Sequence, residues 1–314
     1  MQLPLSKAAI TSTMWQQYLQ EIITGNIKTL ARAISLVENE IAGHEELLKL
    51  LPPSNTPLIG ITGPPGAGKS TLVDALIEAI VREGGKVGIV CVDPSSPFNL
   101  GALLGDRIRM SSWYTHPSVF IRSLATRGAM GGLHPQIMQI TDLMKGAAFD
   151  YVIVETVGVG QSEIEIAGLA DITTVVVVPE AGDDIQSMKA GLMEIADLFV
   201  VNKSDRPGAE AFAANLRKML SPAFRVRNAE VPVLLASASG RTGISELLNE
   251  IKSLLSAGVS NPRRYWLLAD KAWHLIQQQR MKNVGKDHLQ EQIKMQSSDA
   301  GFNLYRFIAD YYPT

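Results

Sequence analysis

The chain has 314 residues, of which 46% are hydrophobic and 19% are charged, a balance typical of soluble globular proteins. A formal net charge of -2 gives no general attraction to nucleic acid or to an anionic membrane, and we expect neither as a partner. One cysteine and five scattered histidines exclude an intramolecular disulfide and disfavour a metal cluster. No apolar run reaches the roughly 18 residues that span a bilayer, and no secretory signal is evident. We therefore expect a cytoplasmic protein, or one of the mitochondrial matrix in a eukaryote.

Three parts are predicted along the chain. Residues 1–55 carry apolar residues at helical spacing and predict two helices, which are separated at residues 25–26 and ended by prolines at residues 52–53. Residues 56–257 alternate short β-branched runs with helical segments, which predicts an α/β fold with a mostly parallel sheet covered by helices on both faces. Residues 258–314 return to helical spacing, and their aromatic stripe is more typical of a packing surface than of a cofactor site. We expect this part to pack on the central part, on the N-terminal helices or on a second subunit.

Seven strands are expected in the middle part. In chain order they are PLIGITG, KVGIVCVD, SVFIRSL, YVIVETVG, ITTVVVVP, LFVVNKSD and VPVLLASA. Ligands of parallel sheets bind at the carboxyl ends of the strands. The polar motifs described below follow these strands, so we expect them to meet at one edge of the sheet.

The stretch GPPGAGKS follows the first expected strand and precedes a helix, which is the context of a phosphate-binding P-loop. Backbone N–H groups of such a loop, and the helix N-terminus behind it, bind phosphate oxygens. Lys69 is expected to reach the β- and γ-phosphates, and the Ser70 hydroxyl to bind Mg²⁺. The residues expected to hold the phosphates are Gly63, Gly66, Ala67, Gly68, Lys69, Ser70 and Thr71.

The sixth strand ends in VVNKSD, which places Asn202, Lys203 and Asp205 in an N-K-x-D arrangement. A carboxylate at the position of Asp205 can accept hydrogen bonds from N1–H and N2–H₂ of guanine, whereas adenine offers neither donor. Ser237, Ala238 and Ser239 lie at the end of the seventh strand and are expected in the nucleotide site, where the backbone of Ser237 and Ala238 could meet the guanine O6. Because an unpaired buried polar group is costly, this pattern predicts GTP and GDP rather than adenine nucleotides as ligands.

Two further loops carry charges that could face the phosphates. Asp93 ends the second strand and could hold Mg²⁺ directly or through water, or it could cap the following turn. Downstream, the stretch GALLGDRIRM contains Asp106 and Arg109. These two residues could form a switch that reads the γ-phosphate, or they could be the solvated start of a helix.

Glu155 ends the strand that we expect beside the P-loop strand. Its carboxylate could contact the Mg²⁺ shell or the attacking water, and the N–H of Gly158 could donate to the γ-phosphate. Val159 stands where a glutamine could orient that water, and Gln161 comes later. We therefore expect slow hydrolysis without a partner.

The stretch PEAGDDIQSMKAG after the fifth strand admits two interpretations. It could be a mobile segment in which Asp183, Gln186 and Lys189 change partners with the nucleotide, and Lys189 could supply positive charge to the transition state. It could also be a simple helix start, capped by Asp183 or Asp184.

These motifs, together with ARAISLVEN, VDPSSP, FIRSLATRGAMGGL and SASGRTGI, make the chain resemble the MeaB/ArgK family of P-loop GTPases. The resemblance implies a homodimer with weak intrinsic GTPase activity. It implies that the partner is an adenosylcobalamin-dependent acyl-CoA mutase such as methylmalonyl-CoA mutase. Family members gate delivery of adenosylcobalamin to that enzyme and protect it from inactivation. The family also has the glutamate form of the magnesium motif, which falls on Glu155, and a third switch region, which falls on residues 182–189.

Other function classes remain open at this stage. A P-loop kinase acting on a small molecule or a transport protein would need an acceptor pocket and usually lacks N-K-x-D. A metal-insertion GTPase would need clusters of cysteine and histidine. A targeting GTPase of the signal-recognition type would need a methionine-rich domain, for which the C-terminal region is too short.

Overall fold

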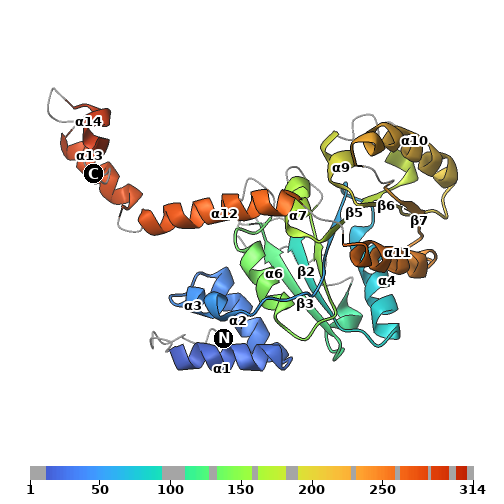
Figure 1. Ribbon diagram of the computed structural model, residues 1–314, viewed down its shortest axis with the longest axis horizontal. Helices are drawn as coiled ribbons and strands as arrows, with labels where there is room; N and C mark the ends of the chain where they lie inside the picture. The colour runs from blue at the N-terminus through green and yellow to red at the C-terminus, as the bar shows by residue number, and fades with distance from the viewer. Residues whose placement is uncertain are drawn as a thin grey trace. The chain divides into compact units, whose positions relative to one another are not determined.

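The structure is a computed structural model of the chain. It describes residues 12–93, 110–126, 133–157, 162–181, 190–227, 231–258, 262–281, 284–296 and 302–309. The chain divides into two compact units, Met1–Arg264 and Tyr265–Thr314, and each is described by itself (Figure 1).

A parallel sheet of seven strands forms the centre of the first unit (Figure 1). The strands are β1 Leu58–Thr62, β2 Val87–Asp93, β3 Val119–Ala125, β4 Tyr151–Glu155, β5 Ile172–Val177, β6 Leu198–Val201 and β7 Val233–Leu235. Their order across the sheet is β3-β2-β4-β1-β5-β6-β7. Strands β1, β2, β5 and β6 are buried along their whole length, because parallel strands are covered on both faces. The predicted α/β fold is confirmed, and so is the expected pairing of β4 with the P-loop strand β1.

Helices of the first unit cover both faces of this sheet (Figure 1). They are α4 Lys69–Arg82, α6 Ile137–Lys145, α7 Ser162–Leu169, α9 Ala190–Ile195, α10 Ala209–Arg227 and α11 Ile244–Ser256, with 3₁₀ turns η1 Ser111–Trp113 and η2 Pro179–Ala181. Successive residues of a strand point to opposite faces, so Ile89 and Cys91 join the core under α4 and α11, whereas Val90 and Val92 join the core under α6.

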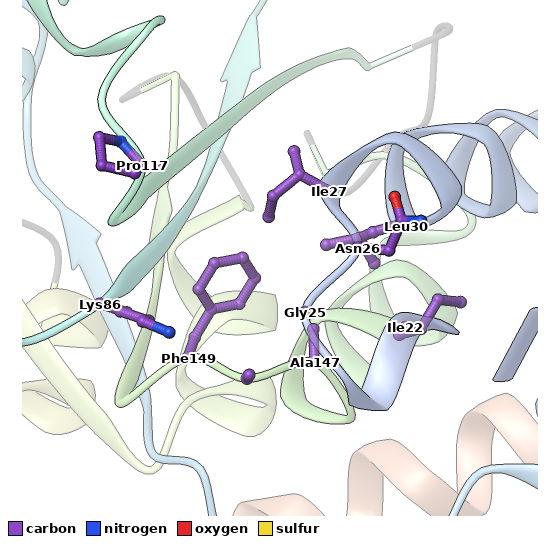
Figure 2. Close-up of a pocket in the computed structure, with 10 residues that line it drawn as sticks. Ile22, Gly25, Asn26, Ile27, Leu30, Lys86, Pro117, Ala147 and Phe149 are labelled. Carbon is purple, nitrogen blue, oxygen red and sulfur yellow. The ribbon is translucent and has the colours of Figure 1, made fainter. Parts of the chain in front are cut away.

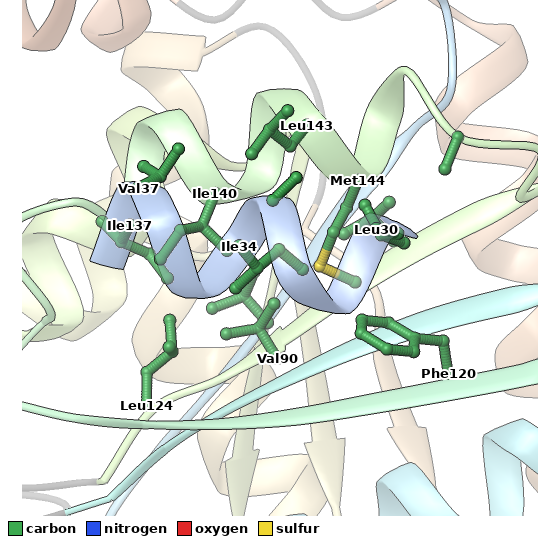
Figure 3. Packing of buried hydrophobic residues seen from close by; sticks show 14 of the residues in the cluster. Leu30, Ile34, Val37, Val90, Phe120, Leu124, Ile137, Ile140, Leu143 and Met144 are labelled. Atoms are coloured by element: carbon green, nitrogen blue, oxygen red, sulfur yellow. The ribbon is translucent and has the colours of Figure 1, made fainter. Parts of the chain in front are cut away.

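The N-terminal helices pack on the α6 side of the sheet. Figure 3 shows Ile34 of one of them against Ile140 of α6 and Val90 of β2. These helices are α1 Ser12–Ile23, α2 Ile27–Glu38 and α3 His44–Leu50. The sequence predicts one helix where the structure has α2 and α3. The helix is interrupted because Glu40 has φ 49° and Gly43 has φ 90°, a left-handed conformation that ends helices.

The described residues of the C-terminal part are helical, as the spacing predicts, and form α12 Pro262–Arg280, α13 Lys286–Gln296 and α14 Leu304–Ala309. The aromatic side chains of this stripe are exposed in the single chain, and their packing on a second subunit stays a prediction. Trp266 is 67% exposed and Trp273 is 61% exposed. None of the described helices is long and apolar enough to cross a membrane.

Candidate nucleotide site

The P-loop connects the end of β1 to the start of α4. Two of its glycines are required by the backbone, since Gly63 has φ +139° and Gly68 has φ +85°. A Cβ at Gly63 would lie 2.1 Å from the carbonyl oxygen of Val176, and one at Gly68 would lie 2.5 Å from the amide nitrogen of Asn202. The loop therefore curls against β5 and against the segment after β6, and only glycine fits these two positions.

Lys69 is the first residue of α4 and is buried. Its ammonium group donates hydrogen bonds to the carbonyl oxygens of Gly63 at 2.9 Å and Pro64 at 3.1 Å. The positive charge is thus held inside the curl of the loop. Phosphate oxygens are stronger acceptors than carbonyls for an ammonium donor, so a bound nucleotide could take over this group.

Ser70 and Glu155 meet below the P-loop. The Ser70 hydroxyl donates a hydrogen bond of 2.6 Å to the Glu155 carboxylate, and both side chains are buried. The pairing of β1 with β4 sets Glu155 opposite Ile61, next to the start of the P-loop. Because the hydroxyl proton is directed to Glu155, the oxygen of Ser70 has the orientation that a bound cation requires.

Asp93 ends β2 at the same edge of the sheet. It lies two residues beyond Cys91, which pairs with Glu155 on the neighbouring strand, and it is buried. Ser70, Asp93 and Glu155 offer the oxygen donors that Mg²⁺ prefers. The described residues contain no cluster of three or more His, Cys, Asp and Glu that could hold a metal. A magnesium ion here would therefore also use water and phosphate oxygens, as nucleotide-bound Mg²⁺ does.

The segment after β6 ties the P-loop to the segment after β7. The Asn202 amide nitrogen donates to the Ala67 carbonyl at 2.8 Å, and its amide oxygen accepts from the backbone N–H of Ala238 at 3.0 Å. Lys203 adds a hydrogen bond of 2.9 Å from its ammonium group to the Gly66 carbonyl. The base-binding and phosphate-binding motifs of the sequence are thus joined by direct contacts.

Asp205 is exposed beside these contacts. Its carboxylate accepts a hydrogen bond from the Ser237 hydroxyl at 2.5 Å. That hydrogen bond is the main reason that the pKa of Asp205 lies below its usual value, and its own backbone N–H and the charges of Arg206 and Lys203 act in the same direction. An exposed and ionised carboxylate can accept both N–H donors of a guanine ring.

The structure brings most of the predicted site residues to the carboxyl edge of the sheet. Those in the described part of the chain are Gly63, Gly66, Ala67, Gly68, Lys69, Ser70, Thr71, Asp93, Glu155, Asn202, Lys203, Asp205, Ser237, Ala238 and Ser239. Four predicted residues, namely Asp106, Arg109, Gly158 and Lys189, lie outside the described residues.

Two hollows lie at the opposite, amino edge of the sheet. One has a volume of 40 Å³ and is lined by residues that include Phe149, Lys86 and Pro117, just before β4, β2 and β3 (Figure 2). The other, of 520 Å³, includes Asp171 and Pro57, just before β5 and β1. Neither hollow faces the P-loop, so neither offers a place for a phosphate acceptor.

A parallel sheet that joins a P-loop to an N-K-x-D segment defines a P-loop GTPase. The comparison with protein families agrees and narrows the class. Residues 30–291 match the family model described as "Methylmalonyl Co-A mutase-associated GTPase MeaB". The chain belongs to this family, and it binds guanine nucleotides and hydrolyses GTP.

Known relatives cover most of the chain. GTPase ArgK of Escherichia coli is 38% identical over 256 residues, which are 78% of this chain and 77% of that protein. The mitochondrial methylmalonic aciduria type A homolog of Mus musculus is 31% identical over 315 residues, which are 89% of this chain and 74% of that protein. A crystal structure of an LAO/AO transport system kinase is 28% identical, with a TM-score of 0.66, and covers 97% of this chain and 99% of its own.

Proposed function

We propose that this chain is a GTP-dependent chaperone of an adenosylcobalamin-dependent acyl-CoA mutase, with methylmalonyl-CoA mutase as the first candidate. The observation that carries the proposal is the match of residues 30–291 to a family whose description names association with that mutase. In this function, GTP binding and hydrolysis gate the loading of adenosylcobalamin and protect the mutase from inactivation.

The proposed division of labour in the site follows the contacts described above. Lys69 binds the β- and γ-phosphates once they replace its carbonyl partners. Ser70, Asp93 and Glu155 hold Mg²⁺, which neutralises charge on the phosphate oxygens when it is bound. Asp205 accepts the guanine N–H donors, and the backbone of Ser237 and Ala238 meets the guanine O6.

The remaining roles fall on segments outside the described residues. We assign the N–H of Gly158 to the γ-phosphate, and Asp106, Arg109 and Lys189 to charges that respond to it. With Val159 after this glycine, no glutamine stands where it would orient water. Hydrolysis is therefore slow until the mutase completes the site, a kind of help that accelerates other GTPases by about 10³–10⁵.

We also propose that the protein is a homodimer. Residues 1–55 would form a helical extension, residues 56–257 the GTPase domain and residues 258–314 the dimerisation region. The exposed aromatic side chains of α12, Trp266 and Trp273, support an interface there, since aromatic residues are enriched where proteins associate. The proposed location is the cytoplasm, or the mitochondrial matrix in a eukaryote. The name of the mouse relative, which is mitochondrial, supports the second location.

Co-purification with methylmalonyl-CoA mutase tests this function. Tagged protein and purified mutase are mixed with a non-hydrolysable GTP analogue, with GDP or without nucleotide. We expect a complex whose stability changes with the nucleotide, and faster single-turnover GTP hydrolysis when the mutase is present. The Lys69→Ala variant, which loses tight triphosphate binding, is the control. No complex in any nucleotide state, or no acceleration, contradicts the proposal.

The same experiment separates hydrolysis from phosphoryl transfer to a protein, the alternative suggested by the kinase name of the solved relative. With GTP labelled at the γ-phosphate, we expect the label in free phosphate. Label recovered on a protein would favour the kinase function instead.

A further inference from the structure

The two carboxylate oxygens of Asp74 bind two different segments of the chain. Asp74 lies on α4, five residues after Lys69, and its side chain is 16% exposed. One oxygen accepts a hydrogen bond from the indole N–H of Trp113 at 2.7 Å, and the other accepts from the guanidinium of Arg241 at 2.5 Å. These partners are 39 and 167 positions away in the sequence. Asp74 therefore joins two distant segments to the P-loop helix.

Arg241 belongs to the turn that carries Ser237 and Ala238, which the proposed function places against guanine and on which this inference rests. Ser237 and Thr242 exchange backbone hydrogen bonds of 3.0 and 3.1 Å, so Arg241 sits inside a closed turn. It has φ 55°, a left-handed conformation that is costly for a residue with a Cβ. Such conformations persist where the surroundings over-determine them, and here two carboxylates hold the side chain.

The second of these carboxylates is Glu78, whose oxygen lies 3.0 Å from Nε of Arg241. Asp74 and Glu78 are four residues apart on α4, so their like charges repel. Arg241 lies between them and removes that repulsion. An exposed surface ion pair contributes little by itself, but this arrangement combines a largely buried carboxylate, two acidic partners and an indole donor. Loss of the Arg241 ion pairs would destabilise the 237–242 turn. That turn contains Ser237, whose hydroxyl binds Asp205.

Trp113 belongs to the second segment that Asp74 contacts. It ends η1, its ring meets His116 edge to face with centroids 5.5 Å apart, and the neighbouring Met110 is fully buried. The indole thus has a defined environment of which Asp74 is a part. A change at Asp74 would alter a spectroscopic signal from Trp113.

We infer that Asp74 is a positioning residue for guanine recognition, which holds the 237–242 turn through Arg241 and links that turn to the environment of Trp113. Binding of the base at Asp205 and Ser237 shifts the turn, and the Arg241–Asp74 contact transmits this shift to the environment of the indole. The inference concerns nucleotide binding by the GTPase and does not depend on the identity of the mutase.

Arg241→Ala is the main test. Alanine keeps the Cβ, so the cost of the left-handed backbone is unchanged while both ion pairs are lost. We expect the dissociation constant for GDP to rise about 1.5- to fivefold, the range for a partly exposed charged contact. Pyrophosphate, which has the phosphates and no base, should bind as in the wild type. Arg241→Lys should recover part of the GDP affinity, because lysine can reach one carboxylate but cannot bridge two.

Arg82→Ala is the matched control. Arg82 pairs with Glu78 at 2.6 Å on the same helix, is 74% exposed and is not part of the turn. This variant should bind GDP as the wild type does. If both variants weaken GDP and pyrophosphate alike, Arg241 contributes only to stability and the inference is overturned.

Trp113 supplies an independent readout. The four tryptophans are labelled with 5-fluorotryptophan, and the Trp113→Phe variant assigns the Trp113 resonance by fluorine NMR. In the wild type and in Arg82→Ala, GDP should shift that resonance. In Arg241→Ala, saturating GDP should shift it much less, and Asp74→Asn should behave similarly while still offering the indole an acceptor. An unchanged response in Arg241→Ala would overturn the link between the turn and Trp113.

Discussion

Ser70 and Glu155 are joined by a hydrogen bond of 2.6 Å, although 85 positions separate them in the sequence. The contact exists because β4 lies beside β1, which sets Glu155 opposite Ile61, and because the P-loop returns Ser70 to the same edge. It orients the Ser70 hydroxyl with its proton toward the carboxylate. A carboxylate that accepts a hydrogen bond from a metal-binding group orients that group in this way.

The first prediction concerns this pair. Glu155→Gln keeps the size of the side chain and an acceptor for Ser70 but removes the charge. Loss of such a supporting group typically costs 10–100-fold in metal affinity, so the Mg²⁺ concentration for half-maximal GTP turnover should rise about tenfold or more. GDP binding should change little. The measurement is single-turnover GTP hydrolysis over a Mg²⁺ titration, with the exposed Glu210→Gln as control. An unchanged Mg²⁺ midpoint would remove Glu155 from the metal site.

The second prediction concerns the choice of base. Asp205→Asn replaces an acceptor of two hydrogen bonds with a side chain that also donates, so one guanine donor loses its partner. GTP affinity should fall about tenfold to a hundredfold, the effect of one unpaired hydrogen-bonding group. Xanthosine triphosphate, which has an acceptor where guanine has a donor, should bind more tightly to the variant than to the wild type. Competition against a fluorescent GDP analogue measures both ligands, and equal GTP affinity in the two proteins would refute the assignment.

Much of this site could be predicted from the sequence because its parts are local. The P-loop is recognisable because neighbouring atoms leave no room for a Cβ at Gly63 and Gly68. Only glycine fits these two positions, so the geometry of the loop leaves a pattern of glycines in the sequence. The sheet is recognisable because strands buried on both faces read as continuous apolar runs. The spacing of N-K-x-D then places Asp205 at the edge where the P-loop lies.

Other parts could not be predicted because they depend on contacts between distant residues. Asp74, Trp113 and Arg241 were not identified as a group, since one charged residue on a helix and one after a glycine turn have no periodic pattern. Their contacts appear only when α4 and the 237–242 turn come together in the fold. The break between α2 and α3 was missed for a related reason, because apolar residues keep helical spacing on both sides of Asn39–Gly43.

The third prediction concerns pH. The Ser237 hydroxyl is the main cause of the lowered pKa of Asp205. A carboxyl group whose pKa is lowered keeps its charge as the pH falls, and loses it only below that pKa. Ser237→Ala should raise the pKa of Asp205 toward the ordinary value of about 3.9. Loss of GDP affinity on acidification should then begin at a higher pH than in the wild type.

Carbon-13 NMR of the carboxyl groups measures this pKa directly, with Asp205→Asn to assign the resonance. Ser239→Ala changes an exposed serine of the same turn and serves as the control, in which the pKa should stay at the wild-type value. If Ser237→Ala and the wild type titrate together, the hydrogen bond does not hold the carboxylate in its charged form.

The fourth prediction concerns the C-terminal helices. Trp266, Trp273 and Ile276 follow each other at spacings of seven and three residues, so they share one face of α12, and all three are exposed. A tryptophan can bury about 150–250 Å² in an interface, which at about 25 cal/mol per Å² is a large gain for association. We expect the wild type to be a dimer. Trp266→Asp places a charge in that face, so the variant should be monomeric, at 34.0 kDa. Light scattering after size-exclusion chromatography measures the mass. Tyr114→Ser, which changes an exposed aromatic residue of the first unit, should remain dimeric. A wild-type monomer at micromolar concentration, or a Trp266→Asp dimer, would place the association surface elsewhere or remove it.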